Sequence, residues 1–285
     1  MKVSRRELLK ATGATAGLAL LLPSKLIKLS GSAAASHELS EKAMLIDVSK
    51  CIGCWWCYAA CRNYNNLGET ELPDKEDAPE LAEDTWSTLF TIEKDGEWSY
   101  RKHACMHCKE ASCESVCPTG AISHIGAVVD IDQEWCIGCG YCVQACPFGV
   151  PHKDEHTGTA RKCTFCIGRI SNGEMPACAD ACPTGAIQFG ERDALLAEAK
   201  SRVEYLKSNG TPEAELYGED ESGGLHVMYV LTGSPAEYGL PEQPAVATNI
   251  EWVKWLSGII GGAIVATIPF WLVFRRKKKI ETESE

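Results

Sequence analysis

Sixteen cysteines dominate the chemistry that this 285-residue chain can carry. They fall into four groups of four, and each group opens with C-x2-C. The groups are Cys51, Cys54, Cys57 and Cys61; Cys105, Cys108, Cys113 and Cys117; Cys136, Cys139, Cys142 and Cys146; and Cys163, Cys166, Cys178 and Cys182. Proline follows the last cysteine of every group except the first, where Arg62 stands instead.

This spacing favours iron–sulfur clusters over the two other common uses of cysteine. The first and third groups have the C-x2-C-x2-C-x3-C run of bacterial two-cluster ferredoxins, in which the fourth cysteine binds the other cluster. Zinc ribbons use C-x2-C pairs, but they do not need a fourth cysteine followed by proline. A disulfide framework gains little from bridges between such close neighbours. Spacing alone leaves a [3Fe–4S] site open, yet cysteine stands at every ligand position, so four [4Fe–4S] clusters are expected.

The elements that position these cysteines are indicated by two short repeats. "CPTGAI" occurs at 117–122 and 182–187, and "CIGC" begins at Cys51 and at Cys136. Alternating apolar stretches at 43–50 and 127–134 precede the two "CIGC" copies and predict short strands. The simplest fold is α+β, with two ferredoxin-like modules that each bind two clusters. Apolar residues at helical spacing predict one further helix over 193–210.

The N-terminal residues 1–35 have the layout of an export signal. Basic residues at 2, 5, 6 and 10 precede an apolar stretch from Ala11 to Leu22, and three alanines at 33–35 offer a cleavage site. The pair Arg5–Arg6 in "SRRELLK" resembles a twin-arginine signal; the alternatives are a general secretory signal and a membrane anchor. The twin-arginine route carries folded proteins, which would keep the thiols on metal in an oxidising compartment.

The C-terminal end predicts one transmembrane helix at 252–274. Its residues 255–274 carry no charge and would span about 30 Å as a helix. The basic run 275–279 follows, and the positive-inside rule places the tail 275–285 in the cytoplasm. The cysteine-rich part would then face the extracytoplasmic (periplasmic) side, in agreement with the predicted export signal.

Composition narrows the function classes. The net charge of −11 argues against a nucleic-acid partner, and 45 % hydrophobic with 24 % charged residues is compatible with a packed core. The sequence contains no nucleophile–base set, phosphate-binding glycine loop or flavin fingerprint. An electron-transfer subunit without a substrate site of its own is therefore favoured over an independent iron–sulfur enzyme and over a structural metal or disulfide protein.

The second cysteine group has four residues between its second and third cysteines, and the fourth group has eleven there. This set of groups is similar to that of electron-transfer beta subunits of membrane-bound molybdopterin oxidoreductases and hydrogenases. Two further segments, 161–203 and 223–244, resemble the formate dehydrogenase-N beta subunit. That family usually lacks an export signal of its own, whereas the hydrogenase-2-type beta-like subunit has one. The formate dehydrogenase resemblance is therefore the first hypothesis, and an electron-transfer subunit of an uptake [NiFe] hydrogenase or of another molybdopterin reductase is the second.

The resemblance also implies which cysteines share a cluster, because the first and fourth groups pair in that family and so do the second and third. The four sets are Cys51, Cys54, Cys57 and Cys182; Cys61, Cys163, Cys166 and Cys178; Cys105, Cys108, Cys113 and Cys146; and Cys117, Cys136, Cys139 and Cys142. The implied partners are a catalytic alpha subunit and a membrane cytochrome b or quinone-reactive subunit.

The resulting domain plan places a four-cluster domain at 36–192, with cluster repeats at about 42–72, 96–127, 127–156 and 157–190. A C-terminal extension at 193–251 follows, before the predicted membrane span.

Trp55 and Trp56 are expected to shield a cluster from water, and His103 and His107 to lie behind the ligands or at the surface. Four cations adjacent to ligands could offset cluster charge or simply be solvated: Lys102, Lys109, Arg161 and Lys162.

Overall fold

The computed structural model describes residues 42–94, 96–245, 259, 261–263 and 267–268. The predicted signal at 1–35 and the tail at 275–285 lie outside these residues, and so does most of the predicted span at 252–274. Among the residues that are described, no helix is both long and apolar enough to cross a bilayer.

The described elements combine strands that are mostly paired antiparallel with helices that are mostly short, as expected of an α+β fold. The strands are β1 (Lys42–Asp47), β2 (Ser87–Lys94), β3 (Glu97–Ala104), β4 (Ile122–Ile125), β5 (Val128–Ile131), β6 (His152–Lys153), β7 (Ala160–Arg161), β8 (Ile187–Glu191), β9 (Glu215–Tyr217) and β10 (Val227–Leu231). The helices are α3 (Trp56–Asn65), α4 (Ser112–Ser115), α5 (Tyr141–Ala145), α6 (Ile167–Ile170), α7 (Ala177–Asp180) and α8 (Arg192–Ser208). Three 3₁₀ turns complete the set: η1 (Val48–Lys50), η2 (Glu221–Gly223) and η3 (Pro235–Tyr238).

The largest sheet has the strand order β8-β1-β10-β9. β1 pairs antiparallel with β8 and parallel with β10, and β10 pairs antiparallel with β9. The predicted C-terminal extension thus supplies two of the four strands. The remaining strands form three two-stranded pairs, β2-β3, β4-β5 and β6-β7.

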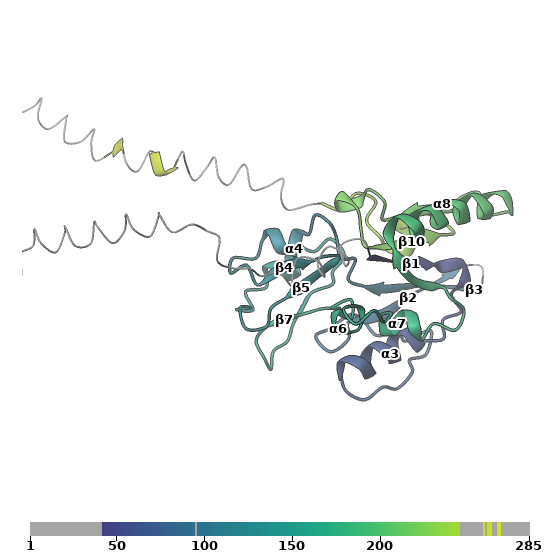
Figure 1. Ribbon diagram of the computed structural model, residues 1–285, viewed down its shortest axis with the longest axis horizontal. Coiled ribbons are helices and arrows are strands. Elements are labelled where there is room, and N and C mark those ends of the chain that lie inside the picture. The colour runs from purple at the N-terminus through teal and green to yellow at the C-terminus, as the bar shows by residue number, and fades with distance from the viewer. Residues whose placement is uncertain (1–41, 95, 246–258, 260, 264–266, 269–285) are drawn as a thin grey trace, which may run out of the picture. The chain divides into compact units, whose positions relative to one another are not determined.

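The two faces of this sheet have different partners because side chains alternate along each strand. On β1, Ala43 and Leu45 pack with Leu195 and Ala199 of α8. Met44 and Ile46 point the other way, into the cluster of buried residues that contains Cys57, Cys105 and Cys178. Figure 1 accordingly shows α8 along one side of β1 and β10, with α3, α6 and α7 on the other.

The secondary structure predicted around the motifs is confirmed. β1 and η1 cover the predicted strand at 43–50, and β5 lies within 127–134. The predicted helix over 193–210 is α8, which ends at Ser208, just before Gly210 in a positive-φ turn. Its buried residues are Arg192, Leu195, Ala199, Val203 and Leu206, which follow the expected helical spacing.

Candidate metal centres

The four C-x2-C loops share one backbone feature. In each loop the residue immediately before the second cysteine is left-handed: Gly53 with φ 65°, His107 with 46°, Gly138 with 61° and Phe165 with 55°. A left-handed residue reverses the chain direction locally and is unusual outside glycine. Four loops with three different sequences therefore adopt the same tight turn, which brings two cysteines together in each.

The third cysteine of the first and third groups is delivered by a helix. Trp55 and Gly140 are both left-handed, and they lie directly before α3 and α5. α3 carries Cys57 and α5 carries Cys142. Trp55 takes this conformation without the freedom of glycine, and its side chain is buried, with 4 % of its surface exposed.

Strand pairing brings the groups together in twos. The strand after the second "CPTGAI", β8, pairs antiparallel with β1, which leads into the first group. The strand after the first "CPTGAI", β4, pairs antiparallel with β5, which leads into the third group. The two arrangements are equivalent, with Ile46 opposite Ile187 in one and Ile131 opposite Ile122 in the other. The first group thus meets the fourth, and the second meets the third.

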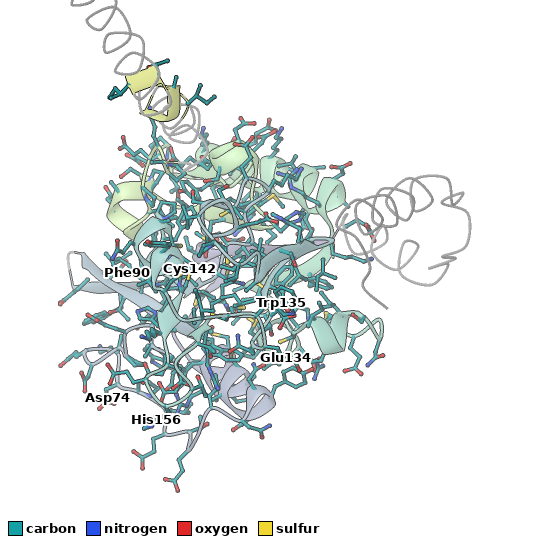
Figure 2. The ribbon with its side chains drawn as sticks, turned by 90° about the vertical axis from the view of Figure 1, so that its left-hand side faces the viewer. Asp74, Phe90, Glu134, Trp135, Cys142 and His156 are labelled. Atoms are coloured by element: carbon teal, nitrogen blue, oxygen red, sulfur yellow. The ribbon has the colours of Figure 1, made fainter. Side chains whose placement is uncertain are left out.

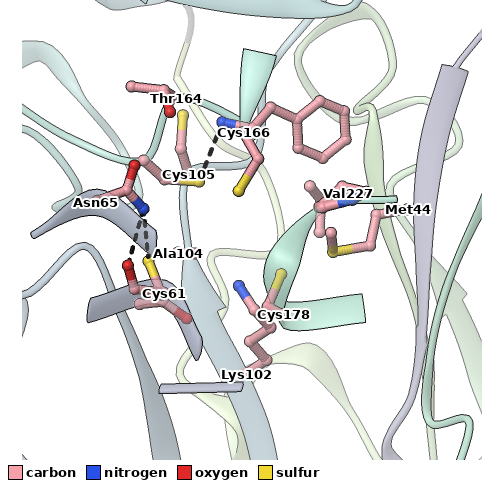
Figure 3. Close-up of a pocket in the computed structure, with 14 residues that line it drawn as sticks. Met44, Cys61, Asn65, Lys102, Ala104, Cys105, Thr164, Cys166, Cys178 and Val227 are labelled. Carbon is pink, nitrogen blue, oxygen red and sulfur yellow. Dashed lines mark hydrogen bonds between the residues drawn. The ribbon is translucent and has the colours of Figure 1, made fainter. Parts of the chain in front are cut away.

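Two cavities lie where the first and fourth groups meet. One is lined by Cys51, Cys54, Cys57 and Cys182 among other residues. The second is lined by Cys61, Cys163, Cys166 and Cys178, and also by Cys105. Figure 3 shows this second cavity, where cysteines from α3, α7 and the loop before α6 surround the space. Lys102 of β3 lines both cavities.

The second and third groups also lie together. The thiol of Cys108 interacts electrostatically with those of Cys105, Cys146 and Cys113. Cys142 interacts in the same way with Cys136 and Cys139. The remaining cysteine of these two groups, Cys117, packs in the same buried cluster as Cys136 and Cys142.

Burial raises the pKa of several cysteine thiols, which therefore hold their protons. The pKa of Cys57 is raised to about 12 and that of Cys142 to about 11, because the interior disfavours a thiolate and neighbouring cysteines add repulsion. Lys102 opposes the rise at Cys57, and Lys162 does so at Cys105. Iron ligation requires the thiolate form, so a cationic metal group would have to replace these protons.

The donor set fits iron–sulfur clusters. All sixteen cysteines are free, and only Cys139 is exposed. Figure 2 shows sulfur atoms within the body of the domain, where Cys142 is labelled. Among the described residues, no three Cys, His, Asp or Glu side chains converge closely enough to hold a single metal ion. Four thiolates around a cavity suit a cubane, which takes one thiolate for each of four irons.

A buried donor next to the cysteines is also without a partner. His107 is fully buried, and its Nδ1 accepts a hydrogen bond from the backbone N–H of Val129 at 3.0 Å. Burial lowers the pKa of His107 well below its usual value, so the ring is neutral and Nε2 carries the proton. Nε2 has no hydrogen-bond acceptor among the described residues. A group with sulfide and thiolate acceptors nearby would be compatible with this donor.

The other residues singled out in the sequence divide between interior and surface. Trp55 is buried and lines the first cavity, whereas Trp56 is 54 % exposed. His103 is half-buried and its Nε2 lies 3.1 Å from the carbonyl of Phe148. Lys102 and Lys162 are buried, but Lys109 is exposed.

The sequence analysis missed several groups that contact cysteine sulfur. The hydroxyls of Thr119 and Thr184 lie 3.7 Å from Sγ of Cys117 and Cys182, respectively. Asn65 donates from Nδ2 to Sγ of Cys61 at 3.6 Å. The two threonines occupy the same place in both copies of "CPTGAI", so the repeat itself carried a signal for them. Such hydrogen bonds to sulfur tune cluster potentials.

Comparisons with known proteins support the assignment of these cysteines to iron–sulfur clusters. Residues 50–121 and residues 96–192 each match a 4Fe-4S dicluster domain. The chain is 38 % identical over 241 residues to the iron–sulfur subunit of the nitrate-inducible formate dehydrogenase of Escherichia coli (strain K12), covering 80 % of this chain and 82 % of that protein. It is 38 % identical over 257 residues to the formate dehydrogenase iron–sulfur subunit of Haemophilus influenzae, covering 84 % and 82 %.

A further relative belongs to the hydrogenase branch, which was the second hypothesis from the sequence. The hydrogenase-2 operon protein HybA of Escherichia coli O157:H7 is 34 % identical over 294 residues, covering 87 % of this chain and 86 % of that protein. The expected family resemblance is confirmed, and both named branches of it are represented. With two dicluster domains and this similarity along most of its length, the chain belongs to the family of formate dehydrogenase iron–sulfur subunits.

Proposed function

We propose that this chain is an electron-transfer subunit that holds four [4Fe–4S] clusters. The proposed ligand sets are Cys51, Cys54, Cys57 and Cys182; Cys61, Cys163, Cys166 and Cys178; Cys105, Cys108, Cys113 and Cys146; and Cys117, Cys136, Cys139 and Cys142. One observation carries the proposal: each of the two cavities between the first and fourth groups is lined by all four members of one proposed set. Each bound cluster would accept and release one electron.

The arrangement of the cavities supports a relay. The two cavities share Lys102 in their walls, so the groups that they would hold are neighbours. Cys105, from a third proposed set, lines the second cavity and so connects it to the next site. The protein keeps water from the path: Trp55 shields the first cavity, and Phe165 and Met44 line the second. Such shielding controls the potentials of clusters.

The end of the described chain supports one orientation of the relay. The hydroxyl of Ser112 donates to the carbonyl of Ala245 at 3.3 Å, next to Cys113. Six residues lie between Ala245 and position 252, where the predicted membrane span begins, and a chain extends by at most about 3.6 Å per residue. The module built from the second and third groups would therefore face the membrane. Electrons would pass between a catalytic subunit at the other end and a membrane cytochrome b or quinone pool.

The proposed catalytic partner is a molybdopterin formate dehydrogenase, because two of the relatives are named as iron–sulfur subunits of formate dehydrogenases. A [NiFe] hydrogenase is the second candidate, favoured by the similarity to the hydrogenase-2 operon protein and by the predicted export signal. In either complex this chain would be the non-catalytic subunit, anchored by one span with its cluster domain on the periplasmic side. Metals in the complex purified through a tag on this chain separate the two: molybdenum or tungsten indicates the first, and nickel the second.

The cluster assignment can be tested with paired substitutions. If the first group pairs with the fourth, Cys51→Ser and Cys182→Ser affect the same cluster, and the double variant loses no more iron than either single one, about a quarter. If the first group pairs instead with the second, as one dicluster match over 50–121 would allow, Cys117 would complete that cluster. Cys51→Ser with Cys117→Ser would then lose about a quarter, whereas the proposed pairing predicts about half. Iron per chain in the purified complex is the measurement.

A further inference from the structure

Two lysines are buried among the cysteines without a carboxylate partner. Lys102 is 4 % exposed and so is Lys162. Within the described part of the chain, neither ammonium group forms a salt bridge with Asp or Glu, although seven other lysine and arginine side chains do. An isolated buried ammonium is strongly unfavourable, so these two charges need compensation from other anions.

The groups that surround Lys102 are cysteines of two proposed clusters, whose sulfurs would be thiolates once iron is bound. Its side chain lines both cavities between the first and fourth groups, and Figure 3 shows it beside Cys178. Cys178, Cys163 and Cys57 are the cysteines whose charges act on it most strongly. Cys57 belongs to one proposed set, and Cys163 and Cys178 to the next.

Lys162 occupies the equivalent place at the following junction. Its Nζ donates to the carbonyl of Cys163 at 3.1 Å and to that of Val129. Cys105, Cys113 and Cys163, in that order, are the cysteines whose charges act on it most strongly, and Asp130 contributes after them. Cys163 belongs to the second proposed set, whereas Cys105 and Cys113 belong to the third.

We infer that Lys102 and Lys162 are fixed internal cations that tune electron transfer, each placed between two successive clusters of the relay. A cluster with four thiolate ligands has a net negative charge, and reduction makes that charge larger by one. A permanent cation between two such clusters stabilises the reduced form of both and weakens their mutual repulsion. The inference rests on the proposed four-cluster function and adds the residues that set its energy profile.

The test is a redox titration, followed by electron paramagnetic resonance, of the whole complex purified through a tag on this chain. Lys102→Met keeps the length of the side chain and removes the charge. It should make reduction of two clusters about tenfold less favourable, which is about 59 mV for a one-electron couple. Lys102→Arg keeps the charge and should leave both potentials close to those of the unsubstituted protein.

Lys162→Met should also lower two potentials, and one of them should be a potential that Lys102→Met lowers, since both lysines border the second proposed set. Lys109→Met is the matched control: this lysine follows Cys108 directly, but it is exposed, so solvent screens its charge. Its substitution should leave all four potentials unchanged.

Iron content separates failure of the inference from failure of the proposed function. A native complex with fewer than about sixteen iron atoms per copy of this chain contradicts the four-cluster function itself. Unchanged potentials in Lys102→Met at full iron content overturn the inference alone. If Lys102→Met loses iron, Lys102→Gln, which keeps a hydrogen-bond donor, takes its place, and unchanged potentials there overturn the inference in the same way.

Discussion

The rings of His107 and Phe165 stack on each other, with centroids 4.6 Å apart and an angle of 28° between their planes. The two residues occupy the same position in the second and fourth C-x2-C loops, and both have a positive φ. The contact between these two turn residues therefore packs two cysteine loops from different modules against each other. Phe165 also contacts Phe189 of β8 edge-on, which connects this pair to the sheet.

This stacked pair predicts that Phe165→Ala loosens the junction between the modules. The side chain is 2 % exposed, so its removal should cost about 3–5 kcal/mol of unfolding free energy. Unfolding of the purified complex in denaturant, with loss of iron absorbance as the signal, measures this cost. Tyr205→Ala, on the exposed side of α8, is the control and should change stability by less than about 0.5 kcal/mol. Equal effects of the two substitutions would contradict the prediction.

The glycines of the two "CIGC" loops predict a graded series of substitutions. A Cβ at Gly53 would overlap the ring of Tyr100, and one at Gly138 would overlap the backbone carbonyl of Gly158. Gly173 has the same left-handed backbone but open space around it. Gly173→Ala should cost about 1–2 kcal/mol from strain alone, and the other two more. Gly138→Ala should be the most damaging, because a backbone carbonyl moves less easily than a side chain. Thermal unfolding and iron content give the order, and a Gly173→Ala effect as large as the others would reject it.

A buried carboxylate connects α8 to the first cysteine loop. Asp47 is 2 % exposed and accepts from Nε of Arg202 at 2.9 Å and from the backbone N–H of Ser49 at 3.0 Å. Arg202→Ala should cost about 1–3 kcal/mol, because it leaves a buried charge with fewer partners. Arg169→Ala is the control, since its partners Asp180 and Glu174 are mostly exposed, and should cost less than about 1 kcal/mol. A double-mutant cycle between Asp47 and Arg202 that gave no coupling energy would be inconsistent with this connection.

His226 predicts a loss of stability in mild acid. Burial lowers its pKa to about 4, with further lowering by Lys109 and Arg192. In the unfolded chain the same ring takes up a proton near pH 6.5. Between about pH 6.5 and pH 4 the unfolded state thus binds more protons, and stability falls as the pH falls. His226→Asn should flatten this dependence of the unfolding free energy, and His156→Asn, at an exposed position labelled in Figure 2, should not. A slope that His226→Asn left unchanged would exclude His226 as its source.

Much of the local structure could be predicted from the sequence, because it depends on near neighbours. C-x2-C spacing, the strands before "CIGC" and the helical periodicity of 193–210 are short-range patterns, and each has its counterpart in β1, β5 and α8. The class of cofactor also followed from local spacing, and the two dicluster matches agree with it.

Cysteine spacing does not say which groups share a cluster, so the sequence predicted that pairing only through the family resemblance. β4 and β5 are separated by a two-residue turn, so the meeting of the second and third groups is local. β1 and β8 are separated by almost the whole cysteine-rich region, and only their pairing brings Cys182 to the cavity of Cys51. No pattern in the sequence distinguishes this long-range pair from a pairing of consecutive groups.

Burial of the charged neighbours was likewise decided by the fold. Three lysines lie within three residues of a cysteine: Lys102, Lys109 and Lys162. Their spacing alone does not predict which of them are buried. Lys102 lies on β3 and lines both cavities, whereas Lys109 is exposed at the surface. The sequence by itself determined the sixteen thiols and the four turns that present them. Which thiols face one another, and which cations lie between them, depends on contacts between residues far apart in the chain, and these exist only once the sheet has formed.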